Sequence, residues 1–353
     1  MPAVMEAQRE RAAIGRPKQV GGMNGYRYDF EKPIAELEHR LQEARKVTDR
    51  GQHPETLKSL EAQLELLKRK VYGGLTPWQR VQLARHPQRP YTLDYISMLM
   101  SEFVQLHGDR LFSDDRALVG GVGKLDGRSC VVLGHQKGRD TKENLMRNFG
   151  SANPEGYRKA LRLMRLGEKF HLPILVFIDT PGAYPGIGAE ERGQAHSIAL
   201  NLREMARLRT PVYLCVIGEG GSGGALGVGV GDWTAMMDHA YYSVISPEGC
   251  AVILWRDRAR APDAASALKL TSTDLVAMGI VDEVIEEPLG GAHRDPTMVA
   301  ERLRSSILRF FKLTDGLAID ALLQRRYERF RRLGAFTSQP PTPPADATPS
   351  PST

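Results

Sequence analysis

A glycine-rich segment is the first place in this sequence where residue types and spacing suggest chemistry. Residues 218–232 read GEGGSGGALGVGVGD, and eight of these fifteen residues are glycine. The segment follows PVYLCVI, an apolar run that is typical of a buried strand. Because glycine costs backbone entropy and removes side-chain packing, a glycine cluster beside a core strand needs a functional or steric explanation.

Two phosphate-binding motifs fit this segment poorly. Gly218, Gly220 and Gly223 satisfy G-x-G-x-x-G, but a dinucleotide site also needs an acidic residue that ends the second strand. Asp238 has the right spacing and precedes the next predicted strand instead. A P-loop requires Lys and then Ser or Thr after its last glycine, where this chain has Ala225 and the next residue is leucine. The sequence therefore excludes a P-loop and disfavours a dinucleotide site.

A serine nucleophile is a third interpretation, because Gly220, Ser222 and Gly224 satisfy G-x-S-x-G. Such an enzyme needs a histidine base and an acidic residue that orients it. Downstream, His239 lies at a predicted strand start and His293 lies in a glycine-flanked loop. Neither is an obvious base, so a serine hydrolase using Ser222 stays open as an alternative.

The interpretation that we favour uses only the backbone. Glycines at a strand-to-helix turn let successive N–H groups point outward, and the helix N-terminus adds partial positive charge. Such a turn is an oxyanion hole, in which one donor typically contributes about 3 kcal/mol to catalysis. We assign this role to residues 220–224. Gly227, Gly229 and Gly231 are expected inside the following helix, where they would relieve crowding against a strand.

The elements around the segment repeat a strand, a glycine-rich loop and a helix. The first unit is strand ILVFID, loop TPGAYPGIG and helix AEERGQAHSIALNLREMARL; the second is strand VYLCVI, loop GEGGSGG and helix ALGVGV. A third strand, YYSVI, leads into a helix that begins at Ser246 and Pro247. This alternation predicts an α/β domain whose ligands bind at the carboxyl ends of the strands, where both loops fall.

Two further elements precede these units. The stretch ALVGGVGKLDGRSCVVLGHQ predicts two strands joined at Asp126-Gly127, a strong hairpin signal. A helix with Pro154 in its first turn follows, capped by Ser151 or Asn153. Its predicted buried residues are Tyr157, Leu161, Met164 and Phe170, and its predicted solvent-facing residues are Arg158, Arg162, Arg165 and Lys169.

The ends of the chain follow other patterns. Apolar residues from Ile34 to Val71 recur at alternating spacings of three and four, interrupted by TDRGQHP. This predicts a hairpin of two amphipathic helices over residues 27–75, whose stripe could close on itself or dock on another subunit. Residues 1–26 and the proline-rich residues 339–353 are expected to be disordered. Residues 319–338, with five arginines in RRYERFRR, predict a solvated amphipathic helix in preference to a nucleic-acid patch.

The composition limits the class of protein. Of 353 residues, 41% are apolar and 25% charged, as in ordinary globular proteins, and the net charge is +6. No apolar stretch is long enough to span a membrane and no signal peptide is evident, so we expect a cytoplasmic protein. Cys130, Cys215 and Cys250 are widely spaced, which argues against disulfides or a metal site and predicts buried thiols.

Several long strings in the chain resemble one family, the α subunits of the carboxyltransferase of bacterial acetyl-CoA carboxylase. Along the chain the strings are RHPQRPYTLDYI, GHQKGRDTKEN, DTPGAYPGIGAEERGQ, VIGEGGSGGALGVGVGD, YSVISPEGCAVILW and EPLGGAHRD, and this order is that of the family. The resemblance runs from about Tyr28 to about Leu333. It implies a crotonase-like α/β fold, a ClpP/crotonase superhelix of ββα units, over residues 76–318.

The resemblance also implies a reaction and partners. Enzymes of this family move a carboxyl group from carboxybiotin, held on a separate biotin carboxyl carrier protein, to acetyl-CoA, giving malonyl-CoA for fatty-acid synthesis. They are α2β2 heterotetramers that work with a biotin carboxylase. The β partner has a four-cysteine zinc ribbon, so zinc is expected only there. Two different functions stay open beside this one: carboxylation of another acyl-CoA such as propionyl-CoA, and a non-catalytic scaffold that binds RNA or a carrier.

Site residues follow from the same resemblance. It implies one oxyanion hole in each subunit, with the α subunit's facing biotin, and we assign this one to the amides of Gly223 and Gly224. The predicted contacts to cofactor and substrate are Gly220, Gly221, Ser222, Gly182, Ala183, Tyr184, Lys137 and Arg139. The loop 181–186 is expected to form the opposite wall, unless it is only a turn rigidified by two prolines. Lys137, Arg139 and Lys142 could meet acyl-CoA phosphates or the carrier, although a solvated surface loop is the interpretation that we favour for them.

Overall fold

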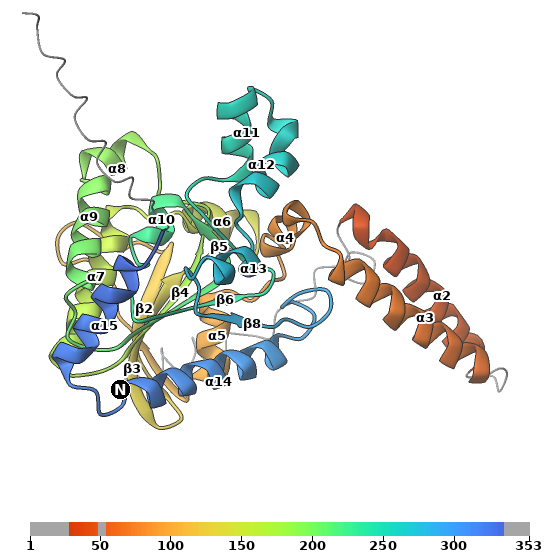
Figure 1. The fold of residues 1–353 in the computed structure, drawn as a ribbon, viewed down its shortest axis with the longest axis horizontal. Helices are drawn as coiled ribbons and strands as arrows, with labels where there is room; N and C mark the ends of the chain where they lie inside the picture. Colours follow the sequence, from red (N-terminus) through yellow and green to blue (C-terminus); the bar gives the residue numbers. More distant parts are fainter. Residues whose placement is uncertain (1–27, 49–53, 335–353) are drawn as a thin grey trace, which may run out of the picture.

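The computed structural model describes residues 28–48 and 54–334. Within them a mixed sheet occupies the centre of the main body (Figure 1), with the strand order β1-β2-β3-β4-β5-β6-β8 and with β7 paired to β5. The strands are β1 (Glu102–Gln105), β2 (Leu118–Leu125), β3 (Arg128–His135), β4 (Ile174–Thr180), β5 (Val212–Gly221), β6 (Trp233–Met237), β7 (Tyr241–Ser243) and β8 (Glu283–Ile285). The tails predicted to be disordered lie outside the described residues.

The predicted β-hairpin is confirmed. β2 and β3 pair antiparallel, and Leu125 lies opposite Arg128. Asp126 and Gly127 have φ values of 50° and 79°, as a two-residue hairpin turn requires. From β3 onward the neighbouring strands β4, β5, β6 and β8 pair in parallel, which confirms the α/β interpretation.

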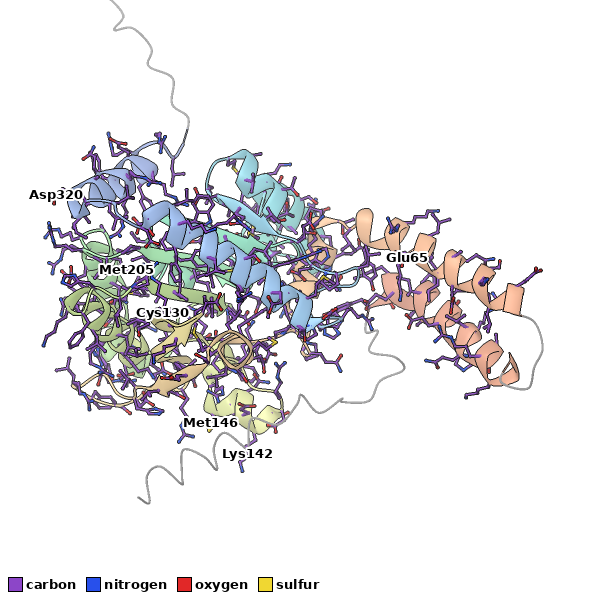
Figure 2. The ribbon with its side chains drawn as sticks, turned by 90° about the horizontal axis from the view of Figure 1, so that it is seen from below. Glu65, Cys130, Lys142, Met146, Met205 and Asp320 are labelled. Atoms are coloured by element: carbon purple, nitrogen blue, oxygen red, sulfur yellow. The ribbon has the colours of Figure 1, made fainter. Side chains whose placement is uncertain are left out.

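Helices cover both faces of the sheet. A Cβ on Gly120 would meet Leu133 of β3 and Leu163 of α7 (Pro154–Lys169) on one face. A Cβ on Gly134, the residue after Leu133, would meet Thr92 of α5 (Thr92–Leu99) on the other face. α9 (Gln194–Met205) packs beside α7, and α14 (Pro296–Thr314) packs beside α5. α6 (Thr141–Met146) carries Lys142 and Met146 at the edge of the body (Figure 2).

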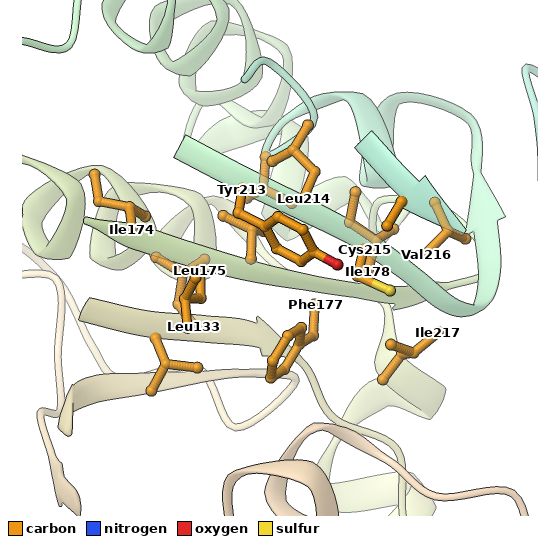
Figure 3. Close-up of a cluster of buried hydrophobic side chains, with 14 of the residues drawn as sticks. Leu133, Ile174, Leu175, Phe177, Ile178, Tyr213, Leu214, Cys215, Val216 and Ile217 are labelled. Atoms are coloured by element: carbon orange, nitrogen blue, oxygen red, sulfur yellow. The ribbon is translucent and has the colours of Figure 1, made fainter. Parts of the chain in front are cut away.

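The core is built from strands that are buried on both faces. Every residue of β4 and of β5 is buried, because helices lie above and below the strands. Figure 3 shows this cluster, in which Phe177 and Tyr213 lie among aliphatic side chains. The three cysteines are buried and free, which confirms their predicted role as small apolar residues.

The N-terminal helices form a hairpin that closes on itself. α2 (Lys32–Thr48) and α3 (Pro54–Gly73) pack together as an arm that projects from the body (Figure 1). Ile34, Leu37 and Leu41 are buried against Leu64 in a small core of their own. Leu83 of α4 (Pro77–Ala84) completes that core and joins the arm to the body. Of the two predicted uses of the apolar stripe, the structure shows the intramolecular one.

Several predicted boundaries are wrong. The helix expected after loop 180–188 is two helices, α8 (Ile187–Glu191) and α9, because Gly193 has a left-handed φ of 82° between them. β5 continues through Gly221, so the first four of the seven residues of the expected loop are strand, and α10 (Ser222–Leu226) ends before Gly227. β1, β6 and β8 have no counterpart in the predicted elements. A Cβ on Gly231 would lie 2.9 Å from Val212 O of β5, so the expected relief of crowding against a strand is confirmed there, although Gly231 lies outside the helix. A Cβ on Gly227 would instead lie 2.7 Å from the Tyr157 ring of a helix.

α7 follows its predicted pattern only in part. Tyr157, Leu161 and Met164 are buried, but Phe170 is 57% exposed because it follows the last helical residue. Arg158 does not face open solvent: its Nε donates to Asp109 Oδ2 over 2.8 Å. The N-cap is Asn153, whose side chain makes no capping hydrogen bond.

The remaining helices complete the C-terminal half. They are α11 (Pro247–Trp255), α12 (Ala261–Leu268), α13 (Ser272–Ala277), α14 and α15 (Ile319–Arg331). Ser246 accepts a hydrogen bond from Gly249 N, which confirms the predicted start of α11. α15 is not simply solvated, because Arg326 within RRYERFRR is buried against Asp232. No helix of residues 28–48 and 54–334 is long and apolar enough to cross a membrane.

Candidate active site

The glycine-rich turn lies where β5 passes into α10. Ser222 begins α10 with φ 50°, a left-handed conformation that is uncommon for a residue with a side chain. Ser222 is exposed, Gly223 is half-buried and Gly224 is buried. A Cβ on Gly224 would lie 2.6 Å from the backbone N of Ala183, so only glycine fits there. The turn is therefore packed against a second loop while its first residues stay accessible.

The N–H groups of Gly223 and Gly224 are available for a ligand. Neither donates a hydrogen bond to a protein acceptor within the described residues, as expected for first-turn amides that have no intrahelical partner. Gly220 and Gly221 differ, because they lie in the ladder between β5 and β7, opposite Tyr242 and Ser243. The anion-binding assignment therefore narrows to Gly223 and Gly224, and it stays a prediction.

The loop after β4 lies directly beside this turn. A Cβ on Gly221 would lie 2.9 Å from Thr180 O, and the backbone of Gly224 faces Gly182 and Ala183. Hydrogen bonds fix the loop: Gly182 N donates to Thr180 Oγ1 over 3.1 Å. The structure thus brings together the two glycine-rich loops that the alternating strands and helices predict at one edge of the sheet.

Tyr184 and its neighbours hold the far end of that loop. Tyr184 N donates to Ala152 O over 3.0 Å. The Nε2 of Gln194 donates to both Ala152 O and Tyr184 O. Tyr184 itself is 38% exposed, and its ring lies over Gly186, where a Cβ would be 2.5 Å from Tyr184 Cε1.

A buried cluster of charges lies beneath both loops, and the sequence interpretation of Lys137 missed it. Lys137 Nζ donates to Asp179 Oδ1 over 2.6 Å and to Glu219 Oε2 over 2.9 Å. Burial alone would lower the pKa of Lys137, but the two carboxylates outweigh it and raise that pKa. The expectation of a solvated surface loop is wrong for Lys137, whose ammonium group faces these carboxylates.

Glu219 is the centre of this cluster. Its Oε1 accepts from Arg85 Nε over 2.5 Å and from Tyr241 Oη over 3.0 Å. Burial alone would raise the pKa of Glu219, but Lys137 and then Arg85 outweigh it and lower the pKa to about 2. Arg85 also donates to Glu248 in the first turn of α11. Glu219 is therefore ionised throughout the neutral range.

Arg139 is also engaged within the chain. Its Nη1 donates to Pro87 O and Arg89 O, both over 2.9 Å, and its Nη2 pairs with Asp94. The guanidinium lies over the Tyr91 ring, 4.0 Å from the centroid. Arg139 is exposed, as the surface-loop interpretation predicts, but these contacts hold its guanidinium against the chain. Lys142, on α6, is exposed as that interpretation predicts.

No histidine makes a hydrogen bond with Ser222 in the part of the chain that the structure describes. The ring of His293 stacks on His86 with centroids 3.8 Å apart, and burial first and then His86 lower its pKa to about 2. His239 is buried, its backbone N donates to Glu287, and burial lowers the pKa of its ring. The structure therefore supplies no base to Ser222, although the strained turn resembles the strand-to-helix elbow of serine hydrolases.

Comparison with known families decides where this arrangement belongs. The family described as "Acetyl co-enzyme A carboxylase carboxyltransferase-like" matches residues 27–334. This chain belongs to that family. The match includes both loops and the charge cluster beneath them.

Relatives in the family are similar along nearly their whole length. The chain is 57% identical over 316 residues to acetyl-coenzyme A carboxylase carboxyl transferase subunit alpha of Xanthomonas axonopodis pv. citri (strain 306), which covers 89% of this chain and 99% of the relative. It is 52% identical over 312 residues to the protein of the same name from Geobacter metallireducens, covering 88% and 98%.

Solved structures agree on the fold. The malonate decarboxylase hetero-tetramer of Pseudomonas in complex with coenzyme A has a chain with a TM-score of 0.54 and 17% identity, and the match covers 68% of this chain and 97% of that one. The transcarboxylase 12S structure with methylmalonyl-coenzyme A bound gives a TM-score of 0.52 and 19% identity, covering 66% and 44%. The acetyl-CoA carboxylase carboxyltransferase-like chain thus has the crotonase-like α/β fold that its sequence predicts.

Proposed function

We propose that this chain is the α subunit of a carboxyltransferase that transfers a carboxyl group from carboxybiotin, on a separate carrier protein, to acetyl-CoA and forms malonyl-CoA. Two observations support the proposal. The relatives with 52–57% identity are named as that subunit. The amides of Gly223 and Gly224 have no acceptor within the described chain and lie at the carboxyl end of β5, where α/β folds bind ligands.

The donor set suits an oxygen that becomes negatively charged. Carboxybiotin, when bound, supplies the carboxyl group and an oxygen that accepts negative charge. We assign Gly223 N–H and Gly224 N–H as the donors to that oxygen. Fixed backbone donors stabilise such charge without having to reorganise, and each is typically worth about 3 kcal/mol. The carboxylates of Asp179 and Glu219 do not oppose this charge, because Lys137 pairs with both.

Ser222, Gly182, Ala183 and Tyr184 are proposed to line the space around that oxygen. Ser222 and Tyr184 are accessible, whereas Gly182 and Ala183 support the turn by packing on Gly224. Gly220 and Gly221 act through the backbone by continuing β5 up to the turn. The chain's own contribution is to hold amides in place, and no side-chain proton transfer is assigned to it.

The proposed partners follow from the family. We propose that the chain assembles with a carboxyltransferase β subunit as α2β2, and that it meets a biotin carboxyl carrier protein loaded by a biotin carboxylase. Zinc is proposed only for the β partner, and the cytoplasm is the proposed compartment. The accessible side of the turn at Ser222 and Gly223 leaves room for a partner to complete the site.

Reconstitution tests the function directly. The purified chain is mixed with its β partner, carboxylated biotin carrier and either acetyl-CoA or propionyl-CoA, and the carboxylated products are measured. We expect malonyl-CoA only when both subunits are present. Turnover by this chain alone would contradict the proposal, and faster carboxylation of propionyl-CoA would replace acetyl-CoA as the substrate.

A further inference from the structure

We propose that Lys137 is a positioning residue for carboxyl transfer: its ammonium group joins the bases of the two site loops and so fixes the Gly221–Gly224 turn against the Thr180–Ala183 loop. The proposal rests on the proposed function of the turn. Lys137 Nζ lies 2.6 Å from Asp179 and 2.9 Å from Glu219. Asp179 directly precedes the first loop, and Glu219 lies two residues before the second.

The strand pairing is irregular at the level of this lysine. β4 and β5 keep one register up to Ile178, which lies opposite Val216, and then shift so that Thr180 lies opposite Gly220. A step of two residues along β4 therefore corresponds to a step of four residues along β5, so β5 contains a bulge. Bulges are typical next to active sites, where they redirect the chain. Here the bulge directs β5 into the glycine turn.

Asp179 stabilises the bulge from the side. Its Oδ1 accepts the N–H of Glu219 over 2.9 Å as well as the Lys137 ammonium. This carboxylate fits only because residue 218 is glycine, since a Cβ there would lie 2.5 Å from Asp179 Oδ1. The same carboxylate oxygen thus holds the backbone of one loop base and the charge of the lysine.

Electrostatics explain why a cation is needed between the loops. Asp179 and Glu219 are both buried, and two buried carboxylates repel unless a cation pairs with them. Glu219 has a second cation in Arg85, whose Nε binds its Oε1. Among the described residues, Lys137 is the one cation that forms an ion pair with Asp179.

The Lys137 side chain is shielded from solvent, so its role is to position the loops and not to bind a ligand. Its side chain is 11% exposed, and Gly150 packs over it, since a Cβ on Gly150 would lie 2.9 Å from Lys137 Cγ. Gly150 ends a run of three left-handed residues that includes Asn148 and Phe149. The ammonium group of Lys137 is paired with both carboxylates and is not free to bind a ligand. Lys137 therefore acts on the reaction only through the loops that it joins.

The test compares two buried cations in the full chain assembled with its β partner. Lys137→Met keeps the aliphatic stem and removes the charge. Lys137→Met/Asp179→Asn also removes the carboxylate that would be left without a cation, and it restores the net charge of the cluster. Arg326→Met is the matched control, because the Arg326 side chain is also shielded from solvent, at 1% exposed, and pairs with Asp232 on another part of the sheet. Measured for each are kcat and KM, the melting temperature, and amide hydrogen exchange of peptides covering 176–186 and 214–226.

We expect Lys137→Met to lower kcat at least tenfold and to change KM less than threefold. Both peptides should exchange faster in that variant, because both loop bases lose their shared contact. The double variant should recover most of the melting temperature and little of kcat. Arg326→Met should lower the melting temperature while kcat per folded enzyme and exchange in both peptides stay as in the wild type.

Three results would overturn the inference. They are a Lys137→Met enzyme with kcat within twofold of wild type, a double variant whose kcat recovers together with its melting temperature, and unchanged exchange in either peptide. Failure of the proposed function is distinguishable, since it would show as a wild-type complex that forms no malonyl-CoA. In that event the exchange data still decide whether Lys137 fixes the two loops.

Discussion

The two ends of the parallel sheet use buried cations for different purposes. At the carboxyl ends, Lys137 joins carboxylates at the bases of two loops that lead into the glycine turn. At the amino ends, Arg326 of α15 binds Asp232 and the carbonyl oxygen of Thr210, the residues that precede β6 and β5. The Arg326 side chain is 1% exposed and the Lys137 side chain is 11% exposed. The comparison suggests that charge beneath the loops serves the geometry of the site, whereas charge at the opposite end anchors a helix.

The largest effect is expected at the carboxyl end. Gly224→Ala adds one methyl group 2.6 Å from Ala183 N and must push the two loops apart. We expect malonyl-CoA formation to fall by about 10²-fold or more, the range seen when an oxyanion donor is lost. Gly223→Val, where the nearest atom to a Cβ is 3.7 Å away, should keep the fold and lose activity similarly by crowding the amides.

Gly73→Ala is the control for these glycine variants, because a Cβ there meets no atom within 4 Å. It should retain wild-type activity and assembly with the β partner. Wild-type turnover in Gly223→Val and Gly224→Ala would show that these amides are not the donors.

The second effect concerns stability at the amino end. Arg326 makes hydrogen bonds to Asp232 and to the carbonyls of Met205, Leu208 and Thr210. Breaking a buried pair by removing one partner typically costs about 3 to 5 kcal/mol of unfolding free energy. Arg326→Met should show that loss in urea unfolding with unchanged kcat. A stable variant with impaired catalysis would reverse the assignment of the two ends.

A smaller effect is expected from acid. The folded-state pKa of His293 is about 2, because it is buried and stacks on His86, against 6.5 for the free side chain. Its neutral form stabilises the fold fully above pH 6.5, and this contribution is lost progressively as pH falls below 6.5 towards 2. Between pH 7.5 and 5.5 the unfolding free energy should fall by about 1.4 kcal/mol from this residue.

Urea unfolding at the two pH values measures this loss. His293→Phe keeps an aromatic ring against His86 and should make the loss smaller by that amount. An identical pH dependence in the variant and the wild type would show that His293 does not cause it.

The smallest effect is the absence of serine reactivity. Since no histidine contacts Ser222 within the described residues, a fluorophosphonate probe should label the chain no more than it labels Ser222→Ala. Labelling of the wild type that disappears in Ser222→Ala would revive the hydrolase interpretation. The strained φ of Ser222 would then have to be explained by nucleophilic catalysis.

Local sequence patterns were enough to predict much of the fold. Asp126-Gly127 defined a hairpin because few residues adopt two successive left-handed conformations. The heptad-like spacing from Ile34 to Val71 defined the arm, since that spacing repeats with the helix turn. The two glycine-rich loops fell at one edge because parallel strands place their carboxyl ends together.

The charge cluster around Lys137 could not be predicted from local sequence patterns. Lys137 lies 42 residues from Asp179 and 82 from Glu219, so no local spacing connects them. Its neighbours in the chain, Arg139 and Lys142, suggested a basic surface loop. The bulge on β5 was hidden for a related reason, because glycines usually predict a loop and here Gly220 and Gly221 pair with β7.

The arm formed by α2 and α3 carries a consequence for engineering. Its apolar contacts come from residues 28–75 and from Leu83, and they are separate from the core around the sheet. The boundary at Thr76, whose side chain caps α4, is therefore a natural crossover point for chimeras between relatives. Arms exchanged there would carry their own interior with them and would need matching contacts at Leu83, at the Gln82 carbonyl that accepts from Tyr28 Oη, and at Arg294, which pairs with Glu31.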